Sequence, residues 1–395
     1  MTTPDRSCRR RQYLLPAGVL ALLAACAGTR EGTPAAEVAA PPKPPSFATA
    51  AQRHQPLGVV AGSPATSREP VEPGASFVDA VAYARDMQSY ALLIWADGAL
   101  QLEQYFGEYD ASLRPESASM HKTVLALTVA AAIEDGFLDG TTQPAATWLT
   151  EWAEDERRNI QLDHLLTMSS GLRPLSVAGG ADSEMGRFFA GGSETRPMIL
   201  GLEASTAPGQ VFSYSNVDSQ LLGLIVERAT GQRYADYLAT RIWQRLGANE
   251  ALVWRNESDG FPRTYTALLA TAQDWLKIGR LIKDQGRYDG DQIISGTLIN
   301  RMVAPSARNP GYGWQIWRGV DRVDRRYYND KNTGLSVSQT EPFLIKDLIF
   351  LDGYGGQRVY ISRERDLVIV RLGEMRLDWD DAQLPNRVVR ALASD

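Results

Sequence analysis

The stretch Ser119-Met120-His121-Lys122 stands directly before a long apolar run, residues 124–133 (VLALTVAAAI). The run predicts a helix that begins near the serine. Residues three apart lie on one face of a helix, about one turn from each other, so Lys122 can reach the hydroxyl of Ser119. A serine needs a neighbouring group to take its proton, and a lysine with a depressed pKa can do this. The pair is therefore a candidate Ser-Lys centre for acyl transfer.

The composition is that of a globular protein with a large core. The chain has 395 residues, of which 44% are hydrophobic and 22% charged, and its formal net charge is -6. Acidic and basic residues are mixed along the chain, and no basic patch stands out. We therefore expect no nucleic-acid partner.

The N-terminus predicts an export signal over residues 1–25. Four arginines, at 6 and 9–11, precede an apolar stretch at 14–25 that is too short to span a bilayer. The stretch ends in Leu23-Ala24-Ala25-Cys26, which resembles the lipobox of bacterial lipoproteins, so we expect Cys26 to be lipidated. An ordinary signal peptide with an incidental cysteine is the alternative. The lipoprotein interpretation places the protein in the cell envelope, on the periplasmic side and anchored to a membrane by lipid alone.

The remaining chain divides into a tether and one domain. Residues 26–75 are rich in Ala, Pro, Gly, Ser and Thr and predict an unfolded tether. Residues 76–395 carry strand patterns near both ends and mostly helical patterns between about 119 and 285. This order favours an α/β (α+β) fold, with an antiparallel sheet built from both chain ends, flanking helices and an all-helical lobe. We expect helices at 77–88, 161–172, 218–230, 272–285 and 380–392, and strands at 90–95, 100–106, 348–351, 358–361 and 367–372.

The residues that are scarce exclude the more common hydrolase sites. There are three histidines: His54 in the tether, His121 inside the Ser-Lys motif, and His164 in a short apolar helix. No Gly-x-Ser-x-Gly turn is present, and neither of the latter two histidines has a context that supports a Ser-His-Asp triad. No Cys/His cluster has the spacing of metal ligands, so we expect no metal and no cofactor. Lysine or tyrosine is then the expected base.

A second motif, Tyr214-x-Asn216, follows the turn Pro208-Gly209 and precedes a predicted helix. Two residues apart on an extended segment point the same way. A cationic Lys122 beside the phenol would lower the pKa of Tyr214, which could then act as base for Ser119 and as acid for the leaving group. The Asn216 amide could bind a substrate carbonyl. A core tyrosine and an asparagine helix cap are the alternatives.

A third motif, Asp352-Gly353-Tyr354-Gly355-Gly356-Gln357, lies between two apolar strands. Glycines in a strand can mark the close approach of another group, here a substrate, with the Gln357 backbone N–H as second oxyanion donor beside that of Ser119. A plain glycine hairpin is the alternative. Residues 331–334 (KNTG) resemble a Lys-Thr-Gly box with an extra residue, and we interpret them as a loop.

Together, these three motifs resemble the penicillin-recognising serine hydrolases, in the branch of class C β-lactamases, D-alanyl-D-alanine carboxypeptidases, esterases and 6-aminohexanoate-dimer hydrolases. The resemblance covers about residues 76–395 and extends to the segments between motifs: residues 162–172 (LDHLLTMSSGL), 208–209 (PG), 221–223 (LLG) and 354–357 (YGGQ). It implies an α/β sheet with a helical lobe and a site in the cleft between them. It also implies that Ser119 is the acylated nucleophile and that Lys122 and Tyr214 share the proton transfers.

The third motif departs from the family pattern in a way that bears on substrate. Lactam-recognising members usually have lysine or histidine where this chain has Tyr354, and a tyrosine supplies no fixed positive charge for a substrate carboxylate. This favours an amide or ester hydrolase acting on a small molecule. A β-lactamase or D,D-carboxypeptidase acting on cell-wall peptides, and a non-catalytic envelope binding protein, remain alternatives. Specificity should depend on loops 173–207 and 304–335, the second of which is either a substrate-facing wall or a solvated surface; the oligomeric state stays open.

Overall fold

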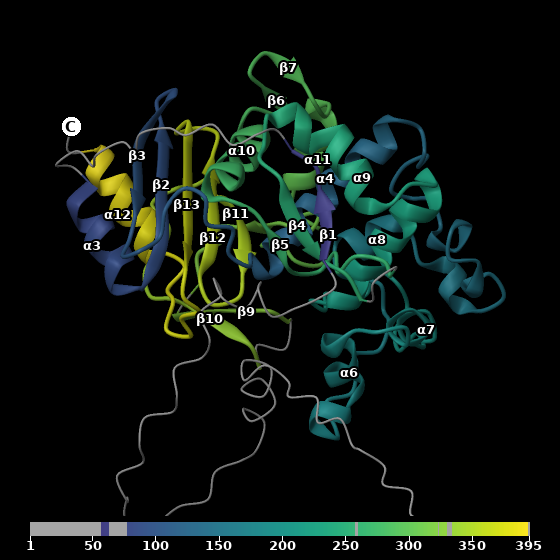
Figure 1. Ribbon diagram of the computed structural model, residues 1–395. Helices are drawn as coiled ribbons and strands as arrows, with labels where there is room; N and C mark the ends of the chain where they lie inside the picture. Colours follow the sequence, from purple (N-terminus) through teal and green to yellow (C-terminus); the bar gives the residue numbers. More distant parts are fainter. Residues whose placement is uncertain (1–56, 63–76, 257–259, 323, 330–333, 394–395) are drawn as a thin grey trace, which may run out of the picture.

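The computed structural model describes residues 57–62, 77–256, 260–322, 324–329 and 334–393. Its centre is a six-stranded antiparallel sheet in the order β3-β2-β13-β12-β11-β8 (Figure 1). The N-terminal strand β2 pairs with the C-terminal strand β13, so both ends of the domain build one sheet, as the sequence predicts. The strands are β2 (Ser89–Ala96), β3 (Ala99–Tyr105), β8 (Trp317–Arg318), β11 (Ile349–Gly353), β12 (Gln357–Ser362) and β13 (Leu367–Gly373).

Both faces of this sheet are buried. Side chains of successive strand residues point to opposite faces, so Leu92 and Ile94 join one core while Ala91 and Leu93 join the other. Helices α3 (Val78–Asp86) and α12 (Gln383–Leu392) cover the first face, at the left of Figure 1. The second face packs against α10 and the helical lobe. Apolar runs without polar alternation are what a sheet covered on both sides requires.

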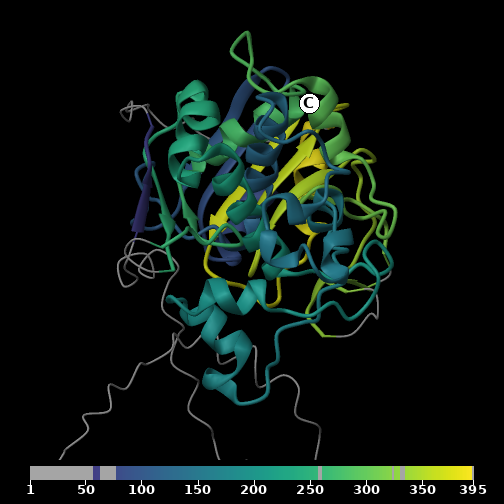
Figure 2. The same cartoon turned by 90° about the vertical axis from the view of Figure 1, so that its right-hand side faces the viewer.

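The helical lobe is arranged around α4 (His121–Glu134). Every residue of α4 from His121 to Ala132 is buried, because a helix that is apolar on all sides must be covered on all sides. Figure 2 shows α6 at the end of the lobe farthest from β6 and β7. The other lobe helices are α5 (Leu162–Leu166), α6 (Glu184–Ala190), α7 (Thr195–Leu200), α8 (Asn216–Thr230), α9 (Tyr234–Leu238) and α11 (Gly296–Val303), with short 3-10 or π turns at 145–147, 150–152, 156–159, 180–182, 239–243 and 244–246.

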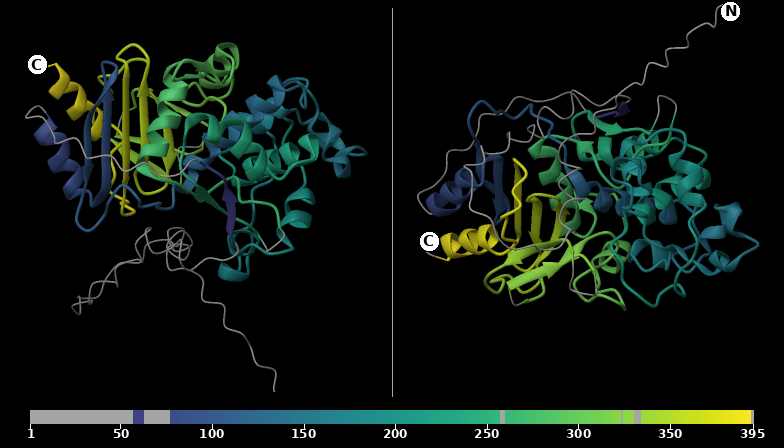
Figure 3. Two further views of the ribbon diagram at one scale, coloured as in Figure 1. Left: turned by 45° about the horizontal axis from the view of Figure 1, so that its top comes forward. Right: turned by 90° about the horizontal axis from the view of Figure 1, so that it is seen from below.

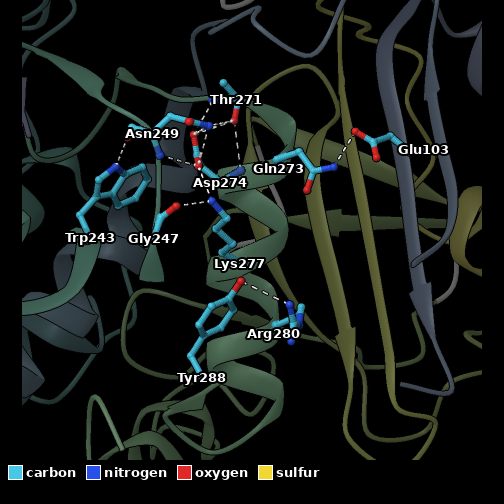
Figure 4. Close-up of polar contacts among 10 residues, drawn as sticks. All are labelled: Glu103, Trp243, Gly247, Asn249, Thr271, Gln273, Asp274, Lys277, Arg280 and Tyr288. Atoms are coloured by element: carbon cyan, nitrogen blue, oxygen red, sulfur yellow. Dashed lines mark hydrogen bonds and ion pairs between the residues drawn. The ribbon is translucent and has the colours of Figure 1, made fainter. Parts of the chain in front are cut away.

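Helix α10 (Ala272–Lys283) joins the lobe to the sheet. A Cβ at Gly279 would lie 2.5 Å from Cγ1 of Val368 in β13, so the glycine permits the helix to lie close on the strands. At its N-terminus Thr271 and the buried Asp274 cap each other, and Asp274 also accepts a hydrogen bond from the Asn249 backbone (Figure 4). Gln273 extends toward β3 and donates to Glu103. These contacts fix the N-terminal end of α10.

A second, smaller sheet pairs β1 (Leu57–Val60), β4 (Ala251–Trp254) and β5 (Leu268–Leu269), and β1 lies beside β4 in Figure 3. Strand β1 falls inside the segment 26–75 that the sequence predicts to be a tether, so those four residues are structured. The export signal and Cys26 lie outside the described residues. Two hairpins complete the fold: β6 (Arg287–Tyr288) with β7 (Asp291–Gln292), and β9 (Asp324–Tyr327) with β10 (Ser336–Gln339). Within the described part of the chain, no helix has the length and apolar character needed to cross a bilayer.

Candidate active site

Ser119 lies in a single 3-10 turn, Ala118–Met120, that leads directly into α4. Its neighbours Ala118 and Met120 are buried, whereas Ser119 is partly exposed. Ala118 has a φ of 49°, a left-handed conformation that is uncommon for a residue with a Cβ. Strained backbone of this kind persists where the surrounding structure holds it, and here it presents the serine at the surface.

The amine of Lys122 makes three hydrogen-bond contacts. Nζ lies 2.9 Å from Oγ of Ser119, 2.8 Å from Oδ1 of Asn216 and 2.7 Å from the carbonyl oxygen of Tyr265. The two carbonyl oxygens can only accept. A neutral amine has two N–H groups and one lone pair, so it can donate to both carbonyls and still accept the proton of the Ser119 hydroxyl. An ammonium would donate to all three oxygens, so the three contacts fit either form of the lysine, and the protonation state depends on burial.

Burial supplies the reason for that neutral form. Lys122 is only 1% exposed, and loss of solvation lowers its pKa from 10.5 to about 7, while the carboxylate of Asp352 acts in the opposite direction. A large share of the amine is thus unprotonated near neutral pH. Lys122 therefore has the lowered pKa that a lysine needs in order to act as a base for serine.

Tyr214 lies over the same amine, with its ring centroid 5.0 Å from Nζ. The prediction that its pKa is lowered is wrong. Burial and the negative charge of Asp352 raise the pKa of the phenol above its usual value, against the smaller lowering effect of a hydrogen bond with Ser119. Lys122 is itself partly neutral near pH 7, so it supplies only part of the positive charge that the prediction assumed. The phenol keeps its proton and suits the role of proton donor.

Asn216 is the first residue of α8 rather than part of an extended loop, and Ser215 is the helix cap. The segment before the helix is held by Met168, whose carbonyl accepts from the Ser213 N–H and whose sulfur contacts the Ser215 N–H. This anchoring directs the amide of Asn216 to Lys122. Its contact in the structure is with the base rather than with an open substrate position.

The third motif meets the serine through β11, the strand that precedes the glycines. A Cβ at Gly353 would lie 2.3 Å from the carbonyl oxygen of Ser117, so the end of β11 packs directly on the turn that carries Ser119. Tyr354 follows at once and is partly exposed. Among the described residues, the structure records no acceptor for its backbone N–H.

The two glycines that follow do not face a substrate. At Gly355 and Gly356 a Cβ would meet Met375 and Trp379, so the close approach that the sequence predicts is made by the chain itself. Gln357 is fully buried in β12, and its side chain binds the backbone of Gly373 at both N–H and C=O. Its backbone pairs with that of Gly353 in the sheet, at the strand end that packs on the serine turn.

Both described histidines have structural partners. Nδ1 of His121 is 2.8 Å from the Thr266 carbonyl and Nε2 is 3.0 Å from the Tyr234 hydroxyl, and burial lowers its pKa to about 4. Nδ1 of His164 accepts from the Gln161 backbone. The sequence argument against a histidine base agrees with these contacts.

Two residues at the site carry no signal in the sequence. The Tyr265 carbonyl holds Lys122 from a loop more than 140 residues away. Gln315 joins three helices: its carbonyl accepts from Thr123 in α4, and its side chain binds Ser219 in α8 and the carbonyls that end α5. Such backbone and cross-lobe contacts depend on the tertiary fold, so no local pattern reveals them.

Most aromatic residues of loop 304–335 are buried, so they do not form a solvated surface. Tyr312, Trp317 and Tyr328 are buried, and their rings surround Tyr214 at centroid distances of 6.1, 5.8 and 5.1 Å. The sequence 331–333, interpreted as a loop, lies outside the described residues. Among the described residues, no cluster of His, Cys, Asp or Glu could hold a metal ion.

A partly exposed serine, a buried amine of lowered pKa and a phenol over that amine are the groups that Ser-Lys acyl-transfer chemistry uses. The beta-lactamase family model matches residues 75–390, and the chain belongs to that family.

Relatives of the chain include a 6-aminohexanoate-dimer hydrolase, penicillin-binding proteins and an esterase. It is 24% identical over 305 residues to the 6-aminohexanoate-dimer hydrolase of Paenarthrobacter ureafaciens, covering 74% of this chain and 73% of that protein. Esterase EstB of Burkholderia gladioli is 30% identical over 162 residues, 38% of this chain and 40% of the esterase. A solved structure from Bacillus anthracis, described as a candidate 6-aminohexanoate-dimer hydrolase, aligns with a TM-score of 0.68 at 19% identity, covering 88% of this chain and 92% of that one. The protein is a serine hydrolase with the β-lactamase fold.

Proposed function

We propose that this protein hydrolyses amide or ester bonds of a small molecule through an acyl-enzyme on Ser119. The observation that carries the proposal is the contact of Lys122 Nζ with the Ser119 hydroxyl, because both other partners of the amine are carbonyl oxygens. In its neutral form, which burial favours, the amine donates to both carbonyls and has its lone pair left for the proton of Ser119. Lys122 is the base in this proposal.

In the first step, Lys122 takes the proton of Ser119 while Oγ attacks the substrate carbonyl carbon. The oxyanion that forms needs two N–H donors, and we assign these to the backbones of Ser119 and Gln357. Gln357 pairs with Gly353 at the strand end that packs on the serine turn. The C–N or C–O bond then breaks, and the amine or alcohol leaves with a proton from Tyr214, which recovers one from Lys122.

In the second step, a water molecule loses a proton to the same pair and attacks the acyl carbon. The acid is released, and Ser119 regains its proton. The sum is one amide or ester and one water giving one acid and one amine or alcohol. No other reactant is needed.

The substrate class follows from the relatives and from Tyr354. The relatives named above include an amide hydrolase and an esterase. A tyrosine at position 354 offers no cation to a substrate carboxylate, which favours substrates without a carboxylate next to the scissile bond. A β-lactam carries such a carboxylate, so penicillin should be a poor substrate.

Hydrolysis of a panel of p-nitrophenyl esters and linear amides tests the function. We expect turnover by the wild type, a loss of at least about 10³-fold in Ser119→Ala, and wild-type rates in Ser117→Ala, the matched serine two residues earlier. No turnover of any panel member would favour a binding protein. Ser119-dependent labelling by a fluorescent penicillin, faster than ester turnover, would favour the β-lactamase or D,D-carboxypeptidase alternative.

The cellular location is a separate part of the proposal. We propose that Cys26 is lipidated and that the enzyme works on the periplasmic side of a bacterial membrane, supported by the apolar stretch and the Leu-Ala-Ala-Cys sequence. Full-length protein should fractionate with membranes, and Cys26→Ser should not. A Cys26→Ser variant that stays with the membranes would contradict the anchor.

A further inference from the structure

Four charged residues are buried together behind the catalytic tyrosine. Arg326 of β9 and Arg358 of β12 each bind both Asp352 and Asp381, at distances between 2.6 and 3.2 Å. The side chains of all four are at most 3% exposed. The cluster has two positive and two negative charges and is therefore neutral as a whole. Buried ion clusters of this kind add little net stability, so their presence calls for another reason.

Asp352 is the member of the cluster that reaches toward the site. It is the residue before Gly353, which packs on the Ser117 carbonyl, and it lies directly opposite Arg358 in the sheet register. Its second carboxylate oxygen accepts a hydrogen bond from the hydroxyl of Tyr328. The ring of Tyr328 in turn meets the ring of Tyr214 edge-on, at 5.1 Å between centroids.

The aromatic rings between cluster and site are also held by the cluster. The guanidinium of Arg326 lies 4.1 Å from the ring centre of Trp317 and 4.7 Å from that of Tyr328. Trp317 stacks on Tyr214 with an interplanar angle of 29°. Two of the three rings that surround Tyr214 are thus fixed by Asp352 or Arg326. The phenol can be held above Lys122 only while those rings keep their places.

On these contacts we propose that Asp352 is a positioning residue of the hydrolase. Through Tyr328 it holds the Tyr214 ring over Lys122, and through its charge it sets the proton balance of the Lys122–Tyr214 pair. The inference rests on the proposed function of that pair. It gives a role to the first residue of the third motif, to which the sequence assigns none.

The charges around Lys122 and Tyr214 predict in which direction their pKa values change when Asp352 is neutralised. Asp352 is the charged group that raises the pKa of Lys122, and it also raises that of Tyr214, whereas Arg326 and Arg358 lower the latter. Without the carboxylate, both pKa values should fall. The titratable groups facing the pair from the surrounding elements are Asp352, Arg326, Arg358, Tyr328, Tyr312, Tyr265, His121 and Ser119.

The test measures fluorophosphonate labelling of Ser119 and ester turnover against pH in three variants of the whole chain. In Asp352→Asn we expect the acidic limb of both profiles to move to lower pH by roughly one unit, because a nearby carboxylate has been removed. In Tyr328→Phe the carboxylate remains, so the limb should stay, while kcat falls about tenfold or more with KM unchanged because the Tyr214 ring is no longer held. Asp381→Asn is the matched control.

Asp381→Asn removes the same charge from the same two arginines but has no contact with Tyr328. It should cost stability without moving the limb. An unchanged limb in Asp352→Asn, or an equal shift in Asp381→Asn, would overturn the proposal. If Asp352→Asn does not fold, Tyr328→Phe decides: unchanged kcat there would overturn it. Absence of wild-type labelling would instead refute the proposed function.

Discussion

Burial decides the chemistry of Lys122. The same side chain on a surface would be a cation at every physiological pH and could not accept a proton from serine. Surrounded by apolar residues of α4 and α8, and bound to two carbonyl oxygens, it is held in the form that can. Burial disfavours the charged form of any group, so it raises the pKa of the neighbouring Tyr214 phenol, which keeps its proton.

The first prediction concerns the pH dependence of the wild type. Because the base must be neutral and its pKa is about 7, kcat/KM should rise with pH around 7 and level off above it. A profile measured from pH 5.5 to 9 with a p-nitrophenyl ester checks this. Lys122→Arg, which stays cationic, should lose at least about 10²-fold at every pH. A wild-type profile that is flat below pH 7 would contradict the assignment of Lys122 as base.

At the scale of elements, the site depends on how close β11 comes to the serine turn. Gly353 permits this approach because it has no side chain, and the strand end then packs on the Ser117 carbonyl. The sequence indicates the importance of glycines here but points to the wrong ones, since Gly355 and Gly356 serve the packing of the turn against Met375 and Trp379. Only the strand pairing distinguishes the two cases.

The second prediction follows from that contact. In Gly353→Ala the new methyl group would lie 2.3 Å from the Ser117 carbonyl, so either β11 or the serine turn must move. We expect kcat to fall about 10²-fold, the scale associated with a displacement of about 1 Å. Gly296→Ala, where the nearest atom is 3.4 Å away, is the matched control and should keep wild-type rates. Wild-type turnover by Gly353→Ala would show that the strand end does not position the nucleophile.

At the scale of the whole molecule, pairing of β2 with β13 joins the two ends of the domain in one sheet and brings the three motifs together. The apolar patterns predicted five of the six strands of this sheet and missed the two-residue strand β8, which is too short to give a pattern. The order of strands and helices predicted a sheet built from both chain ends, and the family resemblance implied the same fold. The pairing of β1 with β4 was missed, since four apolar residues in a Pro- and Ala-rich segment give no periodic signal. The carbonyl of Tyr265 and the bridging Gln315 were missed because their partners lie far away in sequence. The ion pairs of Asp352 were missed because they depend on strand pairing and on Arg326 and Asp381 from other parts of the chain.

The third prediction links the site to the stability of the molecule. The unfolded chain keeps Lys122 protonated up to about pH 10.5, whereas the folded chain releases that proton near pH 7. Between these values unfolding takes up a proton, so the free energy of unfolding gains from this residue as pH rises and loses as pH falls toward 7. Urea unfolding at pH 7 and pH 9 should show a larger gain for the wild type than for Lys122→Met. Equal gains would mean that the folded protein keeps Lys122 charged.

The central claim is that Ser119 is the nucleophile, and the most direct test is to locate the covalent adduct that a fluorophosphonate forms on the protein. The protein is labelled with a fluorophosphonate and digested with trypsin, and the peptide that ends at Lys122 is fragmented in a mass spectrometer. We predict one adduct per chain on Ser119, absent from Ser119→Ala and retained in Ser117→Ala. An adduct on any other residue, or undiminished labelling of Ser119→Ala, would contradict the account.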